Sequence, residues 1–172
     1  MLVALIFVVF PFCMLFAAVS DMLSMTIANR VSVVLTLTFM AVAPFTGMDW
    51  AAYGLHLATG MLVLCFTFGL FAMGGMGGGD AKLLAATSIW MGFNMNLLQY
   101  LVFASLIGGA LTLAILVYRK SPLASLTGHS TFLRHFADEK VGVPYGIALG
   151  LGGLLAFPES PLVLWALAKL SA

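Results

Sequence analysis

Long apolar runs separated by short polar stretches form the main pattern along this chain. The runs cover 2–20, 31–45, 55–73, 83–93, 97–118 and 143–157, and a shorter one covers 162–170. A helix needs roughly 20 apolar residues to cross a bilayer, and shorter runs can be completed by flanking residues or by tilt. The pattern predicts an all-α polytopic membrane protein with about six transmembrane helices, and it leaves the last run undecided.

Composition agrees with a single integral-membrane domain over residues 1–172. The chain is 63% hydrophobic and only 8% charged, which is far outside the range of soluble domains. The lipid bilayer is its expected partner. The net charge is +1, and the basic residues form no stripe with aromatic ones, so no binding of nucleic acid is expected. Ala18-Val19-Ser20 has the form of a signal-peptide cleavage site, but no basic residue precedes it, which favours a retained first helix.

The basic residues predict the orientation in the membrane. The predicted spans place six of the seven basic residues on the same side of the membrane: Arg30, Lys82, Arg119, Lys120, Arg134 and Lys140. Lys169 is the exception. By the positive-inside rule this side is cytoplasmic and the N-terminus lies outside. The polar segment 119–142 is expected to carry a short amphipathic helix at the interface, around Phe132, Leu133 and Phe136.

Two of the six acidic residues, Asp21 and Asp80, lie where apolar runs meet the predicted cytoplasmic face. Each has a simple structural explanation: Asp21 could cap a helix end, and Asp80 could be the N-cap of the next helix. Ionisable groups at membrane depth are costly, however, so the two together point to function. Two carboxylates a few ångströms apart share a proton, and such a pair can activate water against an amide with no metal and no cofactor.

Helical spacing indicates the neighbours of each carboxylate. Asp80 shares its face with Leu83, Leu84 and Thr87, whereas Lys82 points about 200° round the helix, as a topology anchor or a contact to substrate. Asp21 shares its face with Met14, Ala17 and Ala18, whose small alanines would let another helix approach.

The five glycines at 74, 75, 77, 78 and 79 directly precede Asp80. A protease that cuts near a membrane helix has to hold its substrate extended and close to its own backbone, and glycines leave room for that approach. A flexible loop or a close helix crossing would explain the same cluster.

The sequence offers no candidate residues for a zinc hydrolase or a serine hydrolase. There is no HExxH motif for zinc and no GxSxG elbow for a serine nucleophile. His56 is expected at the outer interface, and His129 and His135 in the polar segment. Cys13 and Cys65 fall inside apolar runs and are expected to be buried small hydrophobes.

Three stretches resemble one family. Gly77-Gly78-Gly79-Asp80 fits the GxGD motif of intramembrane aspartyl proteases, and GGGDAKLLAA is similar to the GxGDxKLLA stretch of bacterial type IV prepilin peptidases. VSDMLSMTIANRVSV resembles the end of that family's first helix, with Ala28 where proline is usual. VGVPYGIALGLGGLLAFP resembles its late Pro-[Tyr/Phe]-Gly helix start.

The resemblance implies an aspartic endopeptidase of the bacterial inner membrane with a GxGD protease-like bundle and its active site at the cytoplasmic face. Asp21 and Asp80 would be catalytic, and Gly77, Gly78, Gly79 and Lys82 would contact substrate. The substrate would be a prepilin or pseudopilin, cut typically after a glycine just before its hydrophobic helix. Larger members carry two CxxC pairs in a methyltransferase domain, which this chain lacks, so it resembles the short peptidase-only branch of tight-adherence (Flp-type) pili.

Two other functions stay open at this point. Asp21 and Asp80 could form the ion or proton site of a small membrane channel or transporter, with the glycines as a helix break. The chain could also be a membrane scaffold for pilus assembly with an inactive site.

Overall fold

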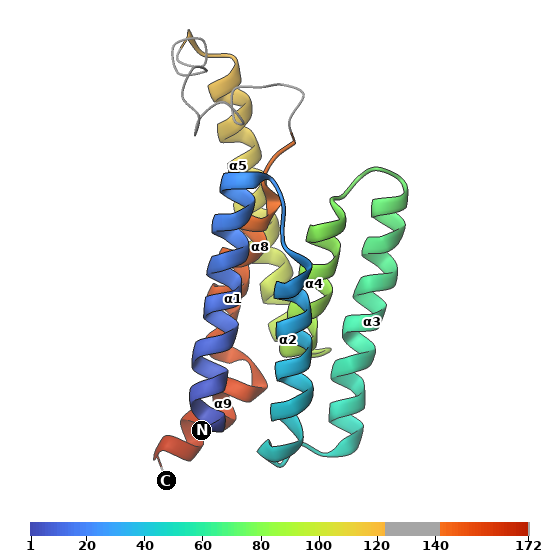
Figure 1. Ribbon diagram of the computed structural model, residues 1–172, viewed down its shortest axis with the longest axis vertical. Helices are drawn as coiled ribbons and strands as arrows, with labels where there is room; N and C mark the ends of the chain where they lie inside the picture. Colours follow the sequence, from blue (N-terminus) through green and yellow to red (C-terminus); the bar gives the residue numbers. More distant parts are fainter. Residues whose placement is uncertain (123–141, 172) are drawn as a thin grey trace.

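The computed structural model describes residues 1–122 and 142–171, and all regular structure in these residues is helical (Figure 1). The all-α prediction is confirmed. The helices are α1 (Leu2–Ser24), α2 (Asn29–Val42), η1 (Ala43–Thr46), α3 (Trp50–Ala72), α4 (Gly78–Met91), α5 (Met95–Arg119), α8 (Tyr145–Ala156), η2 (Phe157–Glu159) and α9 (Pro161–Ser171). The amphipathic helix predicted around Phe132 and Phe136 lies outside the described residues, as do His129, His135, Arg134 and Lys140.

In the part of the chain that the structure describes, four helices are long and apolar enough to cross a membrane: α1, α2 continued by η1, α3 and α5. A fifth crossing arises if α8 with η2 and α9 count as one span, which bends by 44° at its break. The multi-pass prediction is therefore confirmed with four or five candidate spans instead of about six. The difference comes from the run at 83–93, which forms α4, a helix of only 14 residues and hence about 21 Å long.

The short helix α4 lies at the centre of the bundle. Apart from Lys82, its residues from Ala81 to Met91 are all buried, because α2, α3 and α8 pack around it. Trp90 near its end is fully buried and donates a hydrogen bond from Nε1 to the Leu35 carbonyl oxygen at 3.0 Å. A helix covered by protein does not have to match the thickness of the bilayer, which explains how α4 can be shorter than a span.

The helices α1 and α8 pack closely over much of their length. A Cβ at Gly150 would lie 2.7 Å from the Met14 carbonyl oxygen and 3.0 Å from the Ala18 Cβ, so only glycine permits this approach. The prediction that small residues near Asp21 admit another helix is correct, and that helix is α8. Ile6 and Phe10 of α1 are fully buried in the core, so the first apolar run is an integral part of the bundle.

The expectation that both cysteines are buried was wrong for Cys65, whereas the expected place of His56 near the outer interface stays a prediction. His56 is buried at 6% exposure, with Nδ1 2.6 Å from the Ile89 carbonyl oxygen and its ring stacked on Phe39. It lies in the packing of α3 against α4, because its Nδ1 finds a carbonyl partner there. Cys65 is exposed on α3, whereas Cys13 is buried; an apolar run that faces lipid buries only one of its sides.

The end of α1 and the starts of α4 and α8 meet at one end of the bundle, and the N-terminus lies at the other (Figure 1). This end also carries Arg30 in the first turn of α2, Lys82 in the first two turns of α4 and Arg119 at the end of α5. The bundle therefore brings together, at a single end, these three basic residues and both of the aspartates singled out in the sequence.

Candidate active site

Asp21 lies inside the last turn and a half of α1, which continues to Ser24 and ends at Met25 in the left-handed conformation, with φ of 54°. Its side chain is 5% exposed. The Asp21 Oδ2 accepts a hydrogen bond from the Gly146 amide at 2.6 Å. The carboxylate is thus held by another helix, and Asp21 is not a cap at the end of its own helix.

Gly146 holds Asp21 from the first turn of α8. Pro144 is the N-cap of this helix, so the Gly146 amide is one of the first-turn donors that have no partner within the helix. A Cβ at Gly146 would lie 2.7 Å from the Asp21 Cβ and 2.8 Å from Ile27 Cδ1, which leaves no space for any side chain. The sequence indicated only a helix start here, although a glycine directly after Pro-Tyr could have suggested a close contact.

Asp80 is the third residue of α4, and the N-cap is Gly77. The alternative explanation that Asp80 is itself the N-cap is therefore wrong, because the N-cap lies three residues earlier. The Asp80 carboxylate instead reaches back to a hydrogen bond from the Gly77 amide, as an acid at the third helical position does in a capping box. A Cβ at Gly77 would lie 2.7 Å from Asp80 Oδ2, so a side chain at position 77 would displace the carboxylate.

The two carboxylates are close enough to interact. Burial, and to a smaller extent the negative charge of Asp21, raise the pKa of Asp80, the hydrogen bond from Gly77 opposes both, and the net pKa is about 6. Asp80 thus resists ionisation, and its neighbour Asp21 is held by a backbone amide. Two acids in this arrangement share a proton. The end of α1 and the start of α4 thus form one electrostatic unit.

Ile27, in the connection between α1 and α2, lies beside both aspartates. Ile27 is close to Gly146, as described above, and a Cβ at Gly79 would lie 3.1 Å from the Ile27 Cβ. At the neighbouring position, a Cβ on Gly78 would lie 3.2 Å from Phe71 Cε2. Gly78 and Gly79 are therefore packed against the protein's own side chains, whereas Gly77 is exposed beside Asp80.

Lys82 lies on a different side of α4. Its Nζ donates a hydrogen bond to Asn29 Oδ1 of α2 at 2.9 Å, and its side chain is exposed. The helical spacing predicted this separation from Asp80, and the bond to Asn29 is consistent with it. Across the described residues, no group of three or more His, Cys, Asp or Glu side chains could hold a metal ion.

Comparison with known protein families gives one match. The model of the type IV leader peptidase family matches residues 8–113, a range that contains Asp21, Asp80 and the glycines before Asp80. Neither the comparison with curated proteins nor that with solved structures gives a match. Since the matched range covers more than half of the chain, the protein belongs to the type IV leader peptidase family.

Proposed function

We propose that the protein is a membrane aspartic endopeptidase that removes the leader peptides of Flp-type prepilins or pseudopilins. The observation that carries the proposal is the interacting pair of Asp21 and Asp80 at one end of the bundle. Family membership supports a leader peptidase, and the pair supplies the chemistry for it. The active site faces the cytoplasm at the inner membrane, which the basic residues at the same end support.

The two carboxylates take different roles in this proposal. Asp21, whose oxygen accepts the Gly146 hydrogen bond, is the ionised member and removes a proton from water as the water oxygen attacks the scissile carbonyl carbon. Asp80, which keeps its proton up to about pH 6, gives that proton to the carbonyl oxygen. The result is a gem-diol with a neutral Asp21 and an ionised Asp80.

Collapse of the gem-diol restores the pair. Asp21 passes its proton to the amide nitrogen, Asp80 takes a proton from one hydroxyl group, and the C–N bond breaks to give a carboxylic acid and an amine. Both carboxyl groups then return to their starting states. The cycle needs neither a metal nor a cofactor.

The substrate approaches over the glycine turn before α4. Gly77 is exposed next to Asp80 and has no side chain that would cover the carboxylate, so an extended peptide backbone can reach Asp80 there. Gly78 and Gly79 border the same path and also fit against Phe71 and Ile27. Lys82, one turn further, contacts the part of the substrate that follows the scissile bond.

Cleavage of a purified Flp-type prepilin in detergent tests the proposal. Asp21→Asn and Asp80→Asn should each lower the rate by about 10²-fold or more, because each removes one proton-transfer group. Asp49→Asn is the matched control: Asp49 caps α3 by accepting a hydrogen bond from the Ala52 amide, and asparagine caps equally well. Cleavage that persists in both dyad variants would contradict the proposal and favour the ion-site alternative.

A further inference from the structure

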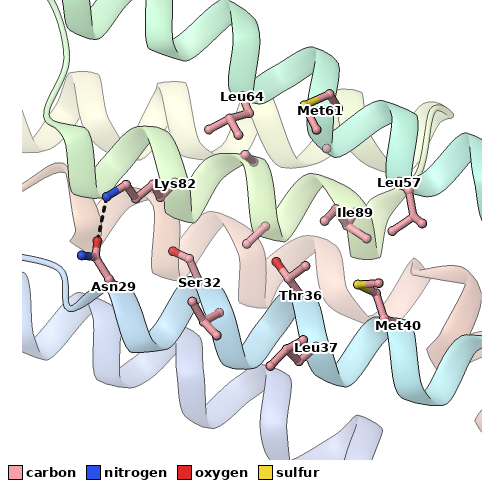
Figure 2. A pocket seen from close by; sticks show the side chains of 14 residues that line it. Asn29, Ser32, Thr36, Leu37, Met40, Leu57, Met61, Leu64, Lys82 and Ile89 are labelled. Carbon is pink, nitrogen blue, oxygen red and sulfur yellow. Dashed lines mark hydrogen bonds between the residues drawn. The ribbon is translucent and has the colours of Figure 1, made fainter.

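A groove runs between α2 and α3 on the side of α4 that carries Lys82 (Figure 2). Both helices pack against α4, but they make little contact with each other along their length. The space between them has a volume of about 660 Å³. Figure 2 shows side chains of α2 and α3 lining it from opposite sides, with Ile89 and Lys82 of α4 between them.

The floor of the groove is made of small residues and its walls of apolar ones. Ala85 and Ala86 of α4 line the floor, and small side chains let a further helix come close. Leu37 of α2 and Met61 of α3 are 59% and 62% exposed on the two walls. From Asn29 to Met40 the groove follows α2 for about 16 Å, which is about three turns of a helix.

One charged side chain lines this apolar groove, at the end nearest the dyad. Within residues 1–122 and 142–171, the Lys82 ammonium bonds only a neutral amide oxygen, that of Asn29 at 2.9 Å, and no carboxylate is among the residues that line the groove. A lysine ammonium has three donors, and at the rim of an apolar surface its strongest partner is an anion. The groove thus fits an apolar helix with a negative charge near its start.

We propose that this groove receives the hydrophobic helix of the substrate, with an acidic side chain of that helix paired to Lys82. The proposal rests on the proposed function and adds a binding surface to it. Asp80 and Lys82 lie on different sides of the first turns of α4, and a helix with its side chains is about 10 Å across. About three extended residues bridge that distance, which places the acidic residue roughly three to six residues after the scissile bond.

Photo-crosslinking tests where the substrate helix docks. A photoreactive amino acid replaces Leu37 or Met61 in the full-length Asp80→Asn variant, which should hold the prepilin uncut. The matched control position is Leu113, which is 65% exposed on α5, a helix that packs mainly on α8. We expect crosslinks to the prepilin helix from both groove positions, at least about fivefold above those from Leu113.

Two outcomes would contradict docking of the substrate helix in the groove while leaving the proposed function intact. One is equal crosslinking from all three positions, and the other is crosslinking of the groove positions to phospholipid alone, in each case with wild-type protein cleaving the same prepilin. Failure of the wild type to cleave that prepilin would instead count against the proposed function.

The charge pairing has its own test in steady-state kinetics. A prepilin with an acidic residue three to six positions after the cut and its variant with the corresponding amide are both given to wild type, Lys82→Met and Lys82→Arg. We expect Lys82→Met to raise the KM for the acidic substrate about tenfold, with little change in kcat. The same variant should leave the KM for the amide substrate nearly unchanged. Lys82→Arg should restore the KM for the acidic substrate. Equal effects of Lys82→Met on both substrates would overturn the pairing.

Discussion

The two sides of α4 differ in how tightly they are packed. On the side of Asp80, a Cβ on Gly146 would lie 2.7 Å from the Asp21 Cβ, which excludes any side chain, and a Cβ on Gly79 would lie 3.1 Å from the Ile27 Cβ, which is a tight contact. On the side of Lys82, a groove of about 660 Å³ remains open between α2 and α3. Close packing fixes the orientation of a carboxylate, whereas an open apolar surface leaves room for a partner, so one short helix can serve chemistry on one side and binding on the other.

Gly146→Ala is the strongest test of the closed side. The new Cβ would overlap Asp21 and Ile27, so the carboxylate would have to turn away from the α8 amide or α8 would have to shift. Overpacking of this kind costs about 1–3 kcal/mol, and we expect cleavage to fall by about 10²-fold. Initial rates on a prepilin, with far-UV circular dichroism to check the fold, measure the effect.

The matched control for this variant is Gly109→Ala on α5, where a Cβ would meet no heavy atom within 4 Å. It should keep wild-type activity. If Gly146→Ala cleaves as fast as Gly109→Ala, the close contact between α8 and Asp21 does not position the carboxylate.

The pH dependence of cleavage tests the electrostatic pairing on the same side. Burial and the charge of Asp21 raise the pKa of Asp80 to about 6, so the proton that Asp80 donates is present below that pH and is lost above it. On the acid side, Asp21 gains a proton and can no longer act as the base. The profile of kcat/KM should therefore be bell-shaped, falling about tenfold per pH unit on each limb.

Asp49→Asn should reproduce the wild-type pH profile, because Asp49 lies in the connection between η1 and α3, away from the dyad. A flat profile, or activity that a chelator abolishes, would be incompatible with a shared proton between two carboxylates and would indicate a metal-dependent reaction.

Met61→Trp tests the open side, with a smaller expected effect. The larger side chain would fill part of the groove between α2 and α3 without touching the dyad, so we expect KM to rise about three- to tenfold while kcat stays within about twofold. Leu113→Trp on the exposed side of α5 is the matched control. A fall in kcat with KM unchanged would show that the residue affects the catalytic end and not a binding groove.

The sequence predicted the elements of this arrangement better than their contacts. Apolar runs gave the helices, and charge at their ends singled out Asp21 and Asp80, because both features are local. The hydrogen bond from Gly146 joins residues 125 positions apart, and no periodicity in either helix specifies it. The length of α4 was also misjudged, since an apolar run looks alike whether lipid or protein covers it. The burial of His56 was not predicted for a similar reason: its partner, the Ile89 carbonyl, belongs to another helix.

The smallest expected effect is at the connection that joins the two sides. Ile27 packs beside the dyad and Asn29 binds Lys82 at the groove, and between them Ala28 has φ −64° and ψ 130°. Proline prefers a φ of about −65°, and among the described residues no hydrogen bond uses the Ala28 amide. Ala28→Pro should therefore stabilise the fold by about 0.4–1 kcal/mol, because it restricts the unfolded chain.

Thermal unfolding in detergent measures this change, and Ala28→Gly is the control of opposite sign, since glycine gives the unfolded chain more freedom. Proline should raise the Tm, glycine should lower it, and cleavage should stay within about twofold of wild type in both. A lower Tm with proline would mean that the connection has to change its backbone conformation for the protein to be stable. In that case the connection from Ile27 to Asn29 would not hold the dyad and the groove rigidly together. The distance between the dyad and Lys82 would then not limit where the acidic residue of a substrate can lie.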